Sequence, residues 1–193
     1  MENMFIEIVR TRRSIRLYHD KPVESEKIDL ILETALRAPS SRGIRPWEFV
    51  VVQDRALIQK LSRSKERGSA FAAGAQVVIV VCADTEKSDA WIEDASIAAT
   101  MILLAAHSLD LGACWVQIRN RQHDKSLSAE GNVRHILAIP EPISVLALIA
   151  IGYPAESLAP HPWSELEYGR IHNIMGEALS DDLSATTPPD RVW

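Results

Sequence analysis

Apolar side chains recur at helical spacing in several parts of the chain. Between residues 25 and 36 they are three or four positions apart, so they would share one face of a helix. The residues of this stripe are Ile28, Ile31, Leu32, Ala35 and Leu36. A shorter stripe predicts a first helix over residues 2–13, and Asp54 is a typical N-cap for another helix over residues 55–63.

Runs rich in Val, Ile and other apolar residues predict β-strands in four places. These runs cover residues 48–53, 75–83, 111–116 and 144–154. The second run, "AQVVIVVCA", is almost continuously apolar and does not alternate with polar residues. Such a run predicts a strand whose two faces are both covered by other elements.

The longest predicted helix spans residues 90–109. Ten of the twelve residues in 95–106 are apolar, and a helix that is apolar on all sides is buried on all sides. In a chain of this size, such a helix lies either at the domain centre or at a subunit interface. The polar residues 120–132 predict a loop, and residues 133–139 predict a short helix that ends at Pro140.

Together these elements predict an α+β layered domain. The regular strand–helix alternation of a doubly wound fold is missing. The sequence has neither a G-x-G-x-x-G motif after the first strand nor a G-x-x-x-x-G-K-[ST] motif. We expect residues 1–193 to form a single domain, in which residues 155–193 are a tail that wraps over a surface.

Composition narrows the class of protein. Apolar residues make up 47% of the chain and charged residues 24%, as in globular proteins, and the formal net charge of −5 argues against general binding to nucleic acid or anionic membranes. No run approaches the roughly 20 apolar residues of a membrane span. The start, "MENMFIEIVR", is too acidic for a signal or transit peptide, so we expect a cytoplasmic protein.

The cysteines and histidines do not form a recognisable chemical motif. Cys82 and Cys114 each lie in a strand-like run, so we expect buried thiols rather than a disulfide framework. The six histidines show no metal-ligand spacing, so no metal site is predicted.

The stretch "IVRTRRSIRLY", residues 8–18, places four arginines within seven positions. On a helix Arg12 and Arg16 would share one face, and two guanidinium groups there repel each other unless an anion lies between them. Arginine matches phosphate oxygens well, and Ser14 adds a hydroxyl donor. A phosphate site and internal salt bridges to the Glu24–Glu26 region both remain open, whereas a nucleic-acid site is disfavoured.

Five sequence motifs, taken in their order along the chain, allow a comparison with known families. They are "RRSIR" at residues 12–16, "APSSRGIRPWEFVVV" at 38–52, "DASIAATMILLAAHSLDLGACW" at 94–115, "IPEPISVLALIAIGYPAE" at 139–156 and "GRIHN" at 169–173. In order and spacing they resemble the nitroreductase family of FMN-dependent oxidoreductases. The resemblance implies a mixed or antiparallel central sheet flanked by helices, in a homodimer whose C-terminal extension lies over the partner.

The resemblance also implies which residues hold FMN at the subunit interface. The flavin phosphate would be bound by Arg12, Arg13, Ser14, Arg16 and the late Arg170. The ribityl chain and ring edge would meet the loop of Pro39, Ser40, Ser41 and Gly43. Backbone groups of Trp115, Val116 and Gln117 would lie along the isoalloxazine ring. Two simpler interpretations stay open, in which Trp115 is a core residue and Arg170 a surface residue.

Two positions depart from the family pattern. Gly43 replaces a usual asparagine whose side chain binds the flavin ring, and Arg45 replaces a usual glutamine. Arg45 either pairs with Glu48 or attracts an anionic substrate.

The implied activity is ping-pong hydride transfer. NADH or NADPH would reduce the flavin at N5, and the flavin would then reduce a small-molecule acceptor such as a nitroaromatic, a quinone or an unknown compound. No protein side chain is needed as a nucleophile. Flavin fragmentation, reductive dehalogenation and a non-catalytic FMN-binding dimer are the alternatives.

Overall fold

The structure is a computed structural model, which describes residues 3–172. The chain divides into two compact units, at Pro160 and His161, and each is described by itself. The helices of the first unit are α1 (Met4–Thr11), α2 (Ser25–Leu36), α3 (Arg55–Leu61), α4 (Trp91–Ser108) and α5 (Ala129–Leu137). Its short 3₁₀ turns are η1 (Ser41–Gly43) and η2 (Ala70–Gly74).

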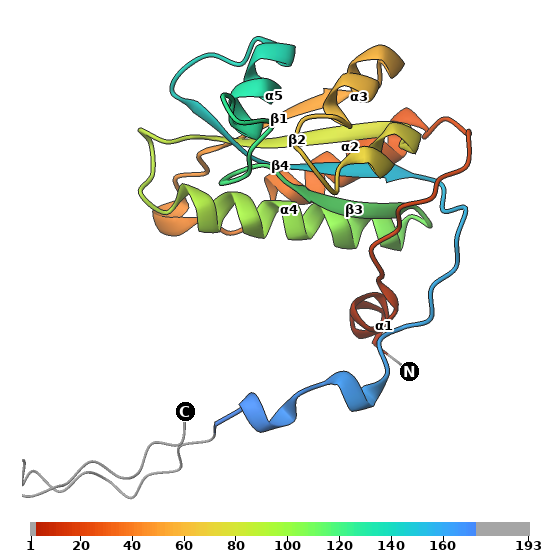
Figure 1. The fold of residues 1–193 in the computed structure, drawn as a ribbon. Coiled ribbons are helices and arrows are strands. Elements are labelled where there is room, and N and C mark those ends of the chain that lie inside the picture. Colours follow the sequence, from red (N-terminus) through yellow and green to blue (C-terminus); the bar gives the residue numbers. More distant parts are fainter. Residues whose placement is uncertain (1–2, 173–193) are drawn as a thin grey trace, which may run out of the picture. The chain divides into compact units, whose positions relative to one another are not determined.

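A four-stranded antiparallel sheet forms the centre of this unit (Figure 1). Its strands are β1 (Trp47–Val52), β2 (Val77–Asp84), β3 (Gly112–Gln117) and β4 (Ile143–Gly152). Their order across the sheet is β1-β2-β4-β3, which places β3 at an edge. The predicted α+β class, and a sheet of the antiparallel kind, are confirmed.

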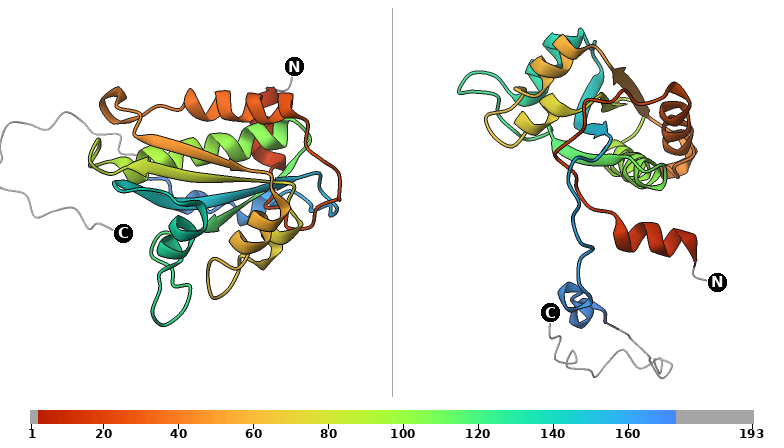
Figure 2. Two further views of the ribbon diagram at one scale, coloured as in Figure 1. Left: turned by 90° about the horizontal axis from the view of Figure 1, so that it is seen from above. Right: turned by 90° about the vertical axis from the view of Figure 1, so that its right-hand side faces the viewer.

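Helices cover both faces of the sheet. Helices α2 and α4 lie on one face, and α3 and α5 lie on the other (Figure 2). Along β2, Ile79 faces the first helix pair and Val80 the second, and both are fully buried. The almost continuous apolar run therefore marks a strand that is covered on both sides, as the sequence predicts.

Helix α4 has one buried face and one outward face. Its alanines pack on the sheet, with Ala95, Ala98 and Ala99 fully buried. On the outward side Ile97 is 40% exposed, and Thr100 is exposed as well. Within this chain the helix is therefore not buried all round, although ten of twelve residues in its middle are apolar.

The chain leaves the helical conformation at Arg12, earlier than the sequence predicts. Helix α1 ends at Thr11, and Arg12 has an extended conformation with φ −59° and ψ 128°. Ser14 then pairs with Ala113 at the edge of β3, where the Ile15 N–H donates to the Ala113 carbonyl over 3.1 Å. The backbone groups of an edge strand attract such pairing, and this explains why the helix stops.

Because residues 12–16 are extended, their side chains alternate between two sides of the chain. Arg12, Ser14 and Arg16 share one side, and Arg13 and Ile15 the other. The prediction that Arg12 and Arg16 share a helical face is therefore wrong. They lie on the same side for a different reason, the two-residue period of an extended segment.

Helix α5 begins four residues before the predicted start. Ser128 caps it by accepting a hydrogen bond of 3.0 Å from the Gly131 N–H. The side chain of Glu130 accepts a hydrogen bond of 2.9 Å from the Val145 N–H and so ties the helix to β4. The predicted loop over residues 120–132 is shorter because this cap and this tie stabilise the polar first turn.

The first residues of the predicted tail are held by the N-terminal segment of the same chain. The Ala155 N–H donates to the Leu17 carbonyl over 2.9 Å. The Glu156 carboxylate accepts from the N–H groups of Arg16 and Leu17 over 2.5 and 3.0 Å. In the second unit the rings of Trp163 and Tyr168 lie 5.2 Å apart, and residues 173–193 of the tail are outside the described residues.

Both cysteines are buried free thiols, as predicted. Burial, the main cause, raises the pKa of Cys82 to about 12. None of the helices within residues 3–172 has the length and apolar character needed to cross a bilayer.

We predict that Gly112→Ala weakens the packing of the N-terminal segment, residues 12–16, against β3. A Cβ at this position would lie 2.6 Å from Cγ2 of Ile15, so one of the two must move. The free energy of unfolding should fall by about 1–3 kcal/mol, the usual cost of overpacking. Urea denaturation followed by tryptophan fluorescence measures it. Gly169→Ala, where no atom lies within 4 Å of the added carbon, is the control and should change it by less than about 0.5 kcal/mol.

We predict that Glu156 stabilises the fold only when ionised. The Arg16 N–H, followed by the Leu17 N–H and the Arg16 charge, lowers the pKa of this carboxyl below its ordinary 4.5. A lowered pKa means that the stabilisation is present above the unfolded-state pKa and is lost as the pH falls through the folded-state pKa. Glu156→Gln should therefore be less stable than the wild type at neutral pH.

Thermal unfolding measured from neutral pH down to about pH 3 checks this sign, because the difference between the two proteins should close over the acidic end of that range. Gln53→Ala, at an exposed position without an ionisable group, is the control, and its stability difference from the wild type should not vary over this range. A constant difference for Glu156→Gln across the range would contradict the prediction.

Candidate functional site

The candidate site lies along the outer edge of β3. Ala113 directs its carbonyl away from β4, toward Ile15. Because backbone groups alternate between the two edges of a strand, those of Trp115 and Gln117 also point away from β4. In the part of the chain that the structure describes, no strand pairs with this edge beyond Ala113.

Three predicted residues converge at the start of this edge. Arg12, Ser14 and Arg16 all lie near Cys114. Burial raises the pKa of that thiol, while the Arg16 charge, a hydrogen bond with Ser14 and the Arg12 charge act against the rise. The Arg16 guanidinium lies 5.7 Å from the ring centre of Phe71 and donates to the Ser14 carbonyl over 3.3 Å.

Tyr18 fixes the end of the arginine segment. Its hydroxyl donates to the carbonyls of Ile15 and Ala150, over 2.6 and 3.2 Å. Burial raises the pKa of this phenol well above its ordinary value, so the group stays a neutral donor. The segment is thereby held against β4 as well as β3.

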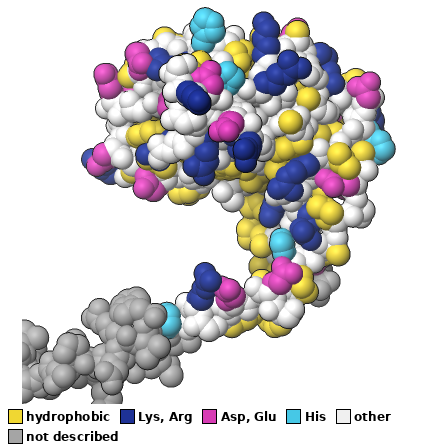
Figure 3. Space-filling view, in the orientation of Figure 1, with side chains coloured by type: hydrophobic (Ala, Val, Ile, Leu, Met, Phe, Trp, Pro, Cys, Tyr) yellow, Lys and Arg dark blue, Asp and Glu magenta, His cyan; other side chains and the backbone are white. Residues whose placement is uncertain are grey.

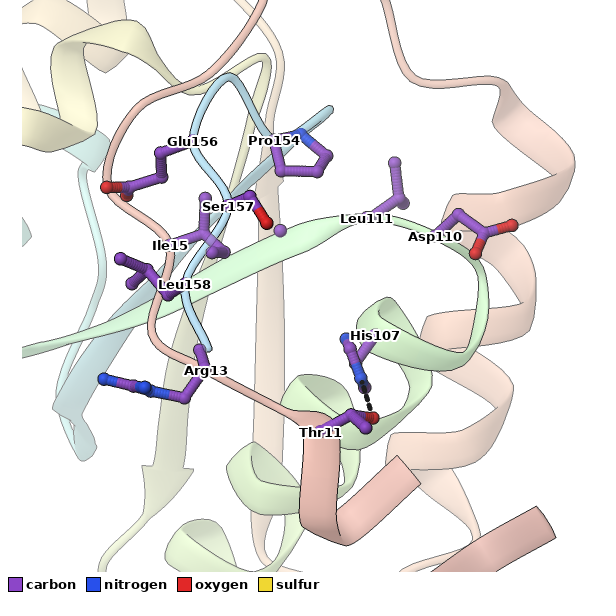
Figure 4. A pocket seen from close by; sticks show the side chains of 11 residues that line it. Thr11, Arg13, Ile15, His107, Asp110, Leu111, Pro154, Glu156, Ser157 and Leu158 are labelled. Carbon is purple, nitrogen blue, oxygen red and sulfur yellow. Dashed lines mark hydrogen bonds between the residues drawn. The ribbon is translucent and has the colours of Figure 1, made fainter. Parts of the chain in front are cut away.

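Arg13 lies on the other side of the segment, against a cavity of about 270 Å³ (Figure 4). Its guanidinium donates to the Ala159 carbonyl. In the same cavity Thr11 Oγ1 and His107 Nε2 are 2.8 Å apart, and burial, followed by the Arg12 charge, lowers the pKa of His107. The structure thus separates Arg13 from the other three residues, and its role in phosphate binding stays a prediction.

The internal salt bridges to the Glu24–Glu26 region are not seen. Glu24 instead accepts from the Tyr153 hydroxyl over 2.6 Å and lies 4.0 Å from Lys21. Within residues 3–172, neither the Arg12 nor the Arg16 guanidinium forms an ion pair with a carboxylate.

The second group of predicted residues, the loop from Pro39 to Arg45, is anchored to the start of α4. The Ser41 N–H donates over 2.7 Å to the buried carboxylate of Asp94, and Arg42 pairs with Asp89 at 2.5 Å. This loop is far along α4 from the arginine segment. Asp94 and His107, which contact the loop and α1 respectively, are about 20 Å apart at 1.5 Å per helical residue.

The loop contains backbone conformations that few residues adopt. Arg42, Gly43 and Arg45 have φ values of 52°, 68° and 53°, in the left-handed region. Gly43 is exposed, and no atom lies within 4 Å of the place where a Cβ would be, so this position is open toward solvent. Arg45 is also exposed, and it does not form the ion pair with Glu48 that the sequence leaves open.

The third group lies on β3 itself. Val116 is fully buried beneath α3 and α5, and its backbone groups point toward β4, opposite to those of Trp115 and Gln117. Trp115 packs partly against the core on the other face, and its Nε1 donates to Gln117 Oε1 over 2.9 Å. Gln117 Nε2 donates in turn to the Arg119 carbonyl over 2.8 Å. These contacts support both interpretations of Trp115, as a core residue and as an edge residue.

Some residues that continue this edge were not predicted from the sequence. The Arg119 guanidinium lies 5.7 Å from the ring centre of Trp91, at the start of α4. Asn120 follows with φ 57°, and Phe71 contacts Arg16 from another loop. The sequence does contain a signal, because the polar residues Arg119 and Asn120 follow the third predicted strand. The residue that Arg119 contacts, Trp91, is distant in sequence, so the contact could not be predicted.

Arg170 belongs to the second unit. It lies in the turn η4 (Tyr168–Arg170), which follows η3 (Trp163–Glu165), and it pairs with Glu167. Its guanidinium is largely exposed, and its role in phosphate binding stays a prediction.

Comparison with known proteins identifies relatives along most of the chain. The family model described as nitroreductase family matches residues 9–68 and 58–153. A protein of Methanothermobacter thermautotrophicus, provisionally named NADH dehydrogenase/NAD(P)H nitroreductase, is 42% identical over 155 residues, which are 79% of this chain and 78% of that protein.

Solved structures of nitroreductase-family proteins are also similar to this chain. An FMN-dependent nitroreductase from Clostridium difficile R20291 has a TM-score of 0.85 at 47% identity, covering 87% of this chain and 98% of that one. A protein of Desulfovibrio desulfuricans solved in complex with FMN has a TM-score of 0.67 at 30% identity, covering 93% of this chain and 100% of that one. The expected oxidoreductase family is confirmed: the chain belongs to the nitroreductase family.

Proposed function

We propose that the protein binds FMN and uses NADH or NADPH to reduce a small-molecule acceptor, such as a nitroaromatic or a quinone. The relatives named or solved with FMN support this proposal. The observation that carries it is the pair of guanidinium groups of Arg12 and Arg16, which converge with Ser14 beside an open strand edge.

The arginine segment fits the phosphate of FMN. Arg12 and Arg16 lack carboxylate partners within residues 3–172, so a bound anion would supply the negative charge that the described residues do not. Guanidinium groups bind phosphate oxygens through paired N–H donors, and the Ser14 hydroxyl adds another donor. The positive charge near the chain start is thereby explained by one local anion.

The open edge of β3 fits the flavin ring. Outward N–H and C=O groups at Trp115 and Gln117 supply fixed donors and acceptors for the polar rim of the ring, and the hydrogen-bonded series from Trp115 to Arg119 keeps this edge rigid. Bound FMN supplies the two-electron chemistry between donor and acceptor. The protein residues bind and orient it, and the nearby guanidinium charges stabilise negative charge on it.

We propose that a second copy of the chain completes the site. The loop from Pro39 to Arg45 is held at the opposite end of α4 from the arginines. When two α4 helices pack antiparallel about a two-fold axis, the loop of each copy reaches the arginine end of the other. In that arrangement Pro39, Ser40, Ser41 and the backbone of Gly43 meet the flavin of the partner, and the exposed Arg45 meets incoming acceptors, favouring anionic ones.

Exposed apolar surface supports such a dimer. Helix α1 has no buried residue, and Met4, Phe5 and Val9 are 79%, 58% and 49% exposed. The outward face of α4 adds Ile97. Apolar surface of this extent is typical of an interaction site. The single domain of residues 1–193 stays a prediction, and its tail of residues 155–193 would extend over the partner.

We predict that Arg16→Ala reduces the affinity for FMN by about 10–100-fold, the loss expected for one charge-assisted contact of about 1.5–3 kcal/mol. Flavin absorbance per chain after purification and titration of the apoprotein with FMN both measure it. Arg37→Ala, which removes an exposed arginine paired with Glu33 on α2, is the matched control and should leave the affinity unchanged. A colourless wild-type protein that takes up no added FMN would refute the proposed function.

We predict that Ile97→Arg separates the dimer and lowers FMN retention together. A charged group on the outward face of α4 would be buried in the proposed interface at a high cost. Light scattering during size exclusion gives the mass, and flavin absorbance in the same peak gives the occupancy. Ala56→Arg, on the exposed side of α3, is the control and should remain a flavin-bearing dimer. A dimeric Ile97→Arg variant with full flavin would contradict the composite site.

A further inference from the structure

A second positively charged site lies beside the arginine segment, between the loop after α3 and the loop after β3. We call it the basic groove. Its defining residues are Arg63, Lys65, Arg67, Ser69, Arg121 and His123. It consists of two adjoining cavities of about 420 and 290 Å³, which share Lys65, Glu66 and Arg67. Lys and Arg side chains are frequent on the molecular face drawn in Figure 3.

Backbone contacts hold the two loops in register. The Glu66 N–H donates to the Gln122 carbonyl over 3.0 Å and so joins the loops. Gly68, with φ 79°, turns the first loop back, and a Cβ there would lie 3.7 Å from Lys65 Nζ. The ammonium group of Lys65 is thereby folded into the wall of the groove instead of extending into solvent.

The positive charge of the groove exceeds the negative charge of its carboxylates, which are Glu66 in its lining and Asp124 at 3.8 Å from His123 Nε2. Glu66 lies 3.8 Å from the Arg67 Nε, but both side chains are largely exposed, and such pairs contribute little. Among residues 3–172 no carboxylate lies within ion-pair distance of Lys65. Burial, followed by the Arg121 charge, lowers the pKa of Lys65. A partly buried ammonium beside a guanidinium is stabilised when an anion binds between them.

The groove is next to the candidate flavin site. Phe71, two residues after Ser69, lies under the Arg16 guanidinium at 5.7 Å. Cys114, which is near Arg16, is also near enough to Lys65 to act on it electrostatically. None of the residues that define the groove belongs to the predicted FMN contacts, so its charge is available to a second ligand.

We propose that the basic groove binds a phosphate of the adenosine half of the nicotinamide coenzyme, an inference that rests on the proposed function. The hydride donor must place its nicotinamide on the flavin, and the basic groove is the positively charged surface beside that site which its phosphates would meet. Two cavities side by side have room for more than one phosphate ester. The coenzymes carry phosphate groups at two positions. Both have the central diphosphate, and NADPH also has a 2′-phosphate.

The test compares Lys65→Ala and Arg121→Ala with Lys60→Ala, an exposed lysine on α3 outside both cavities. KM and kcat are measured for NADH and NADPH with a generic quinone, and flavin content is measured alongside. We expect KM to rise about tenfold, with kcat and flavin content unchanged. A rise for NADPH alone assigns the groove to the 2′-phosphate, and an equal rise for both assigns it to the diphosphate.

A binding measurement makes the test independent of turnover. Calorimetric titration of the oxidised protein with 2′,5′-ADP should show binding that weakens about tenfold in Lys65→Ala and Arg121→Ala, and that weakens with added salt in the wild type. Unchanged KM values and unchanged 2′,5′-ADP affinity in both variants would overturn the inference. A wild type that holds no flavin or oxidises neither coenzyme overturns the proposed function instead.

Discussion

The pairing of the N-terminal segment with the edge of β3 is the contact on which the candidate site depends. Helix α1 ends at Thr11, and the hydrogen bond from Ile15 to Ala113 holds the segment that follows against β3. The two-residue period then sorts the arginines to opposite sides of the chain. Gly112 allows this approach because Ile15 occupies the space where a side chain would be. The proposed phosphate site thus depends on backbone geometry first and on charge second.

Helix α4 determines how the remaining parts are distributed. It fixes the arginine segment at one end, through Thr11 and His107, and the serine loop at the other, through Asp94. A long helix with small buried residues keeps these groups apart within a chain and, in the proposed dimer, would match them between two chains. The composite nature of the proposed site follows from this separation, and the exposed Ile97 lies on the surface that the proposed dimer would bury.

Much of the architecture could be predicted from the sequence because local patterns determine it. The stripe from Ile28 to Leu36, the Asp54 cap and the apolar run of β2 each depend on near neighbours in the chain. The end of α1 could not be predicted, since it depends on Ala113, about a hundred residues away. The first turn of α5 was missed because its stability comes from Glu130 and β4. The local cluster of Arg12, Ser14 and Arg16 already indicated a phosphate site beside the alternative of salt bridges, and the resemblance assigned it to FMN. Lys65 and Arg121, by contrast, meet only through the topology.

The buried thiols of Cys82 and Cys114 have a consequence for durability. Reduced flavins that meet dioxygen release hydrogen peroxide, and peroxide attacks thiolates rather than thiols. Both side chains are nearly inaccessible, and burial keeps them protonated, most strongly Cys82 in the centre of the sheet. An enzyme of the proposed kind would therefore tolerate its own oxidising by-product without sulfenic acid formation at these positions.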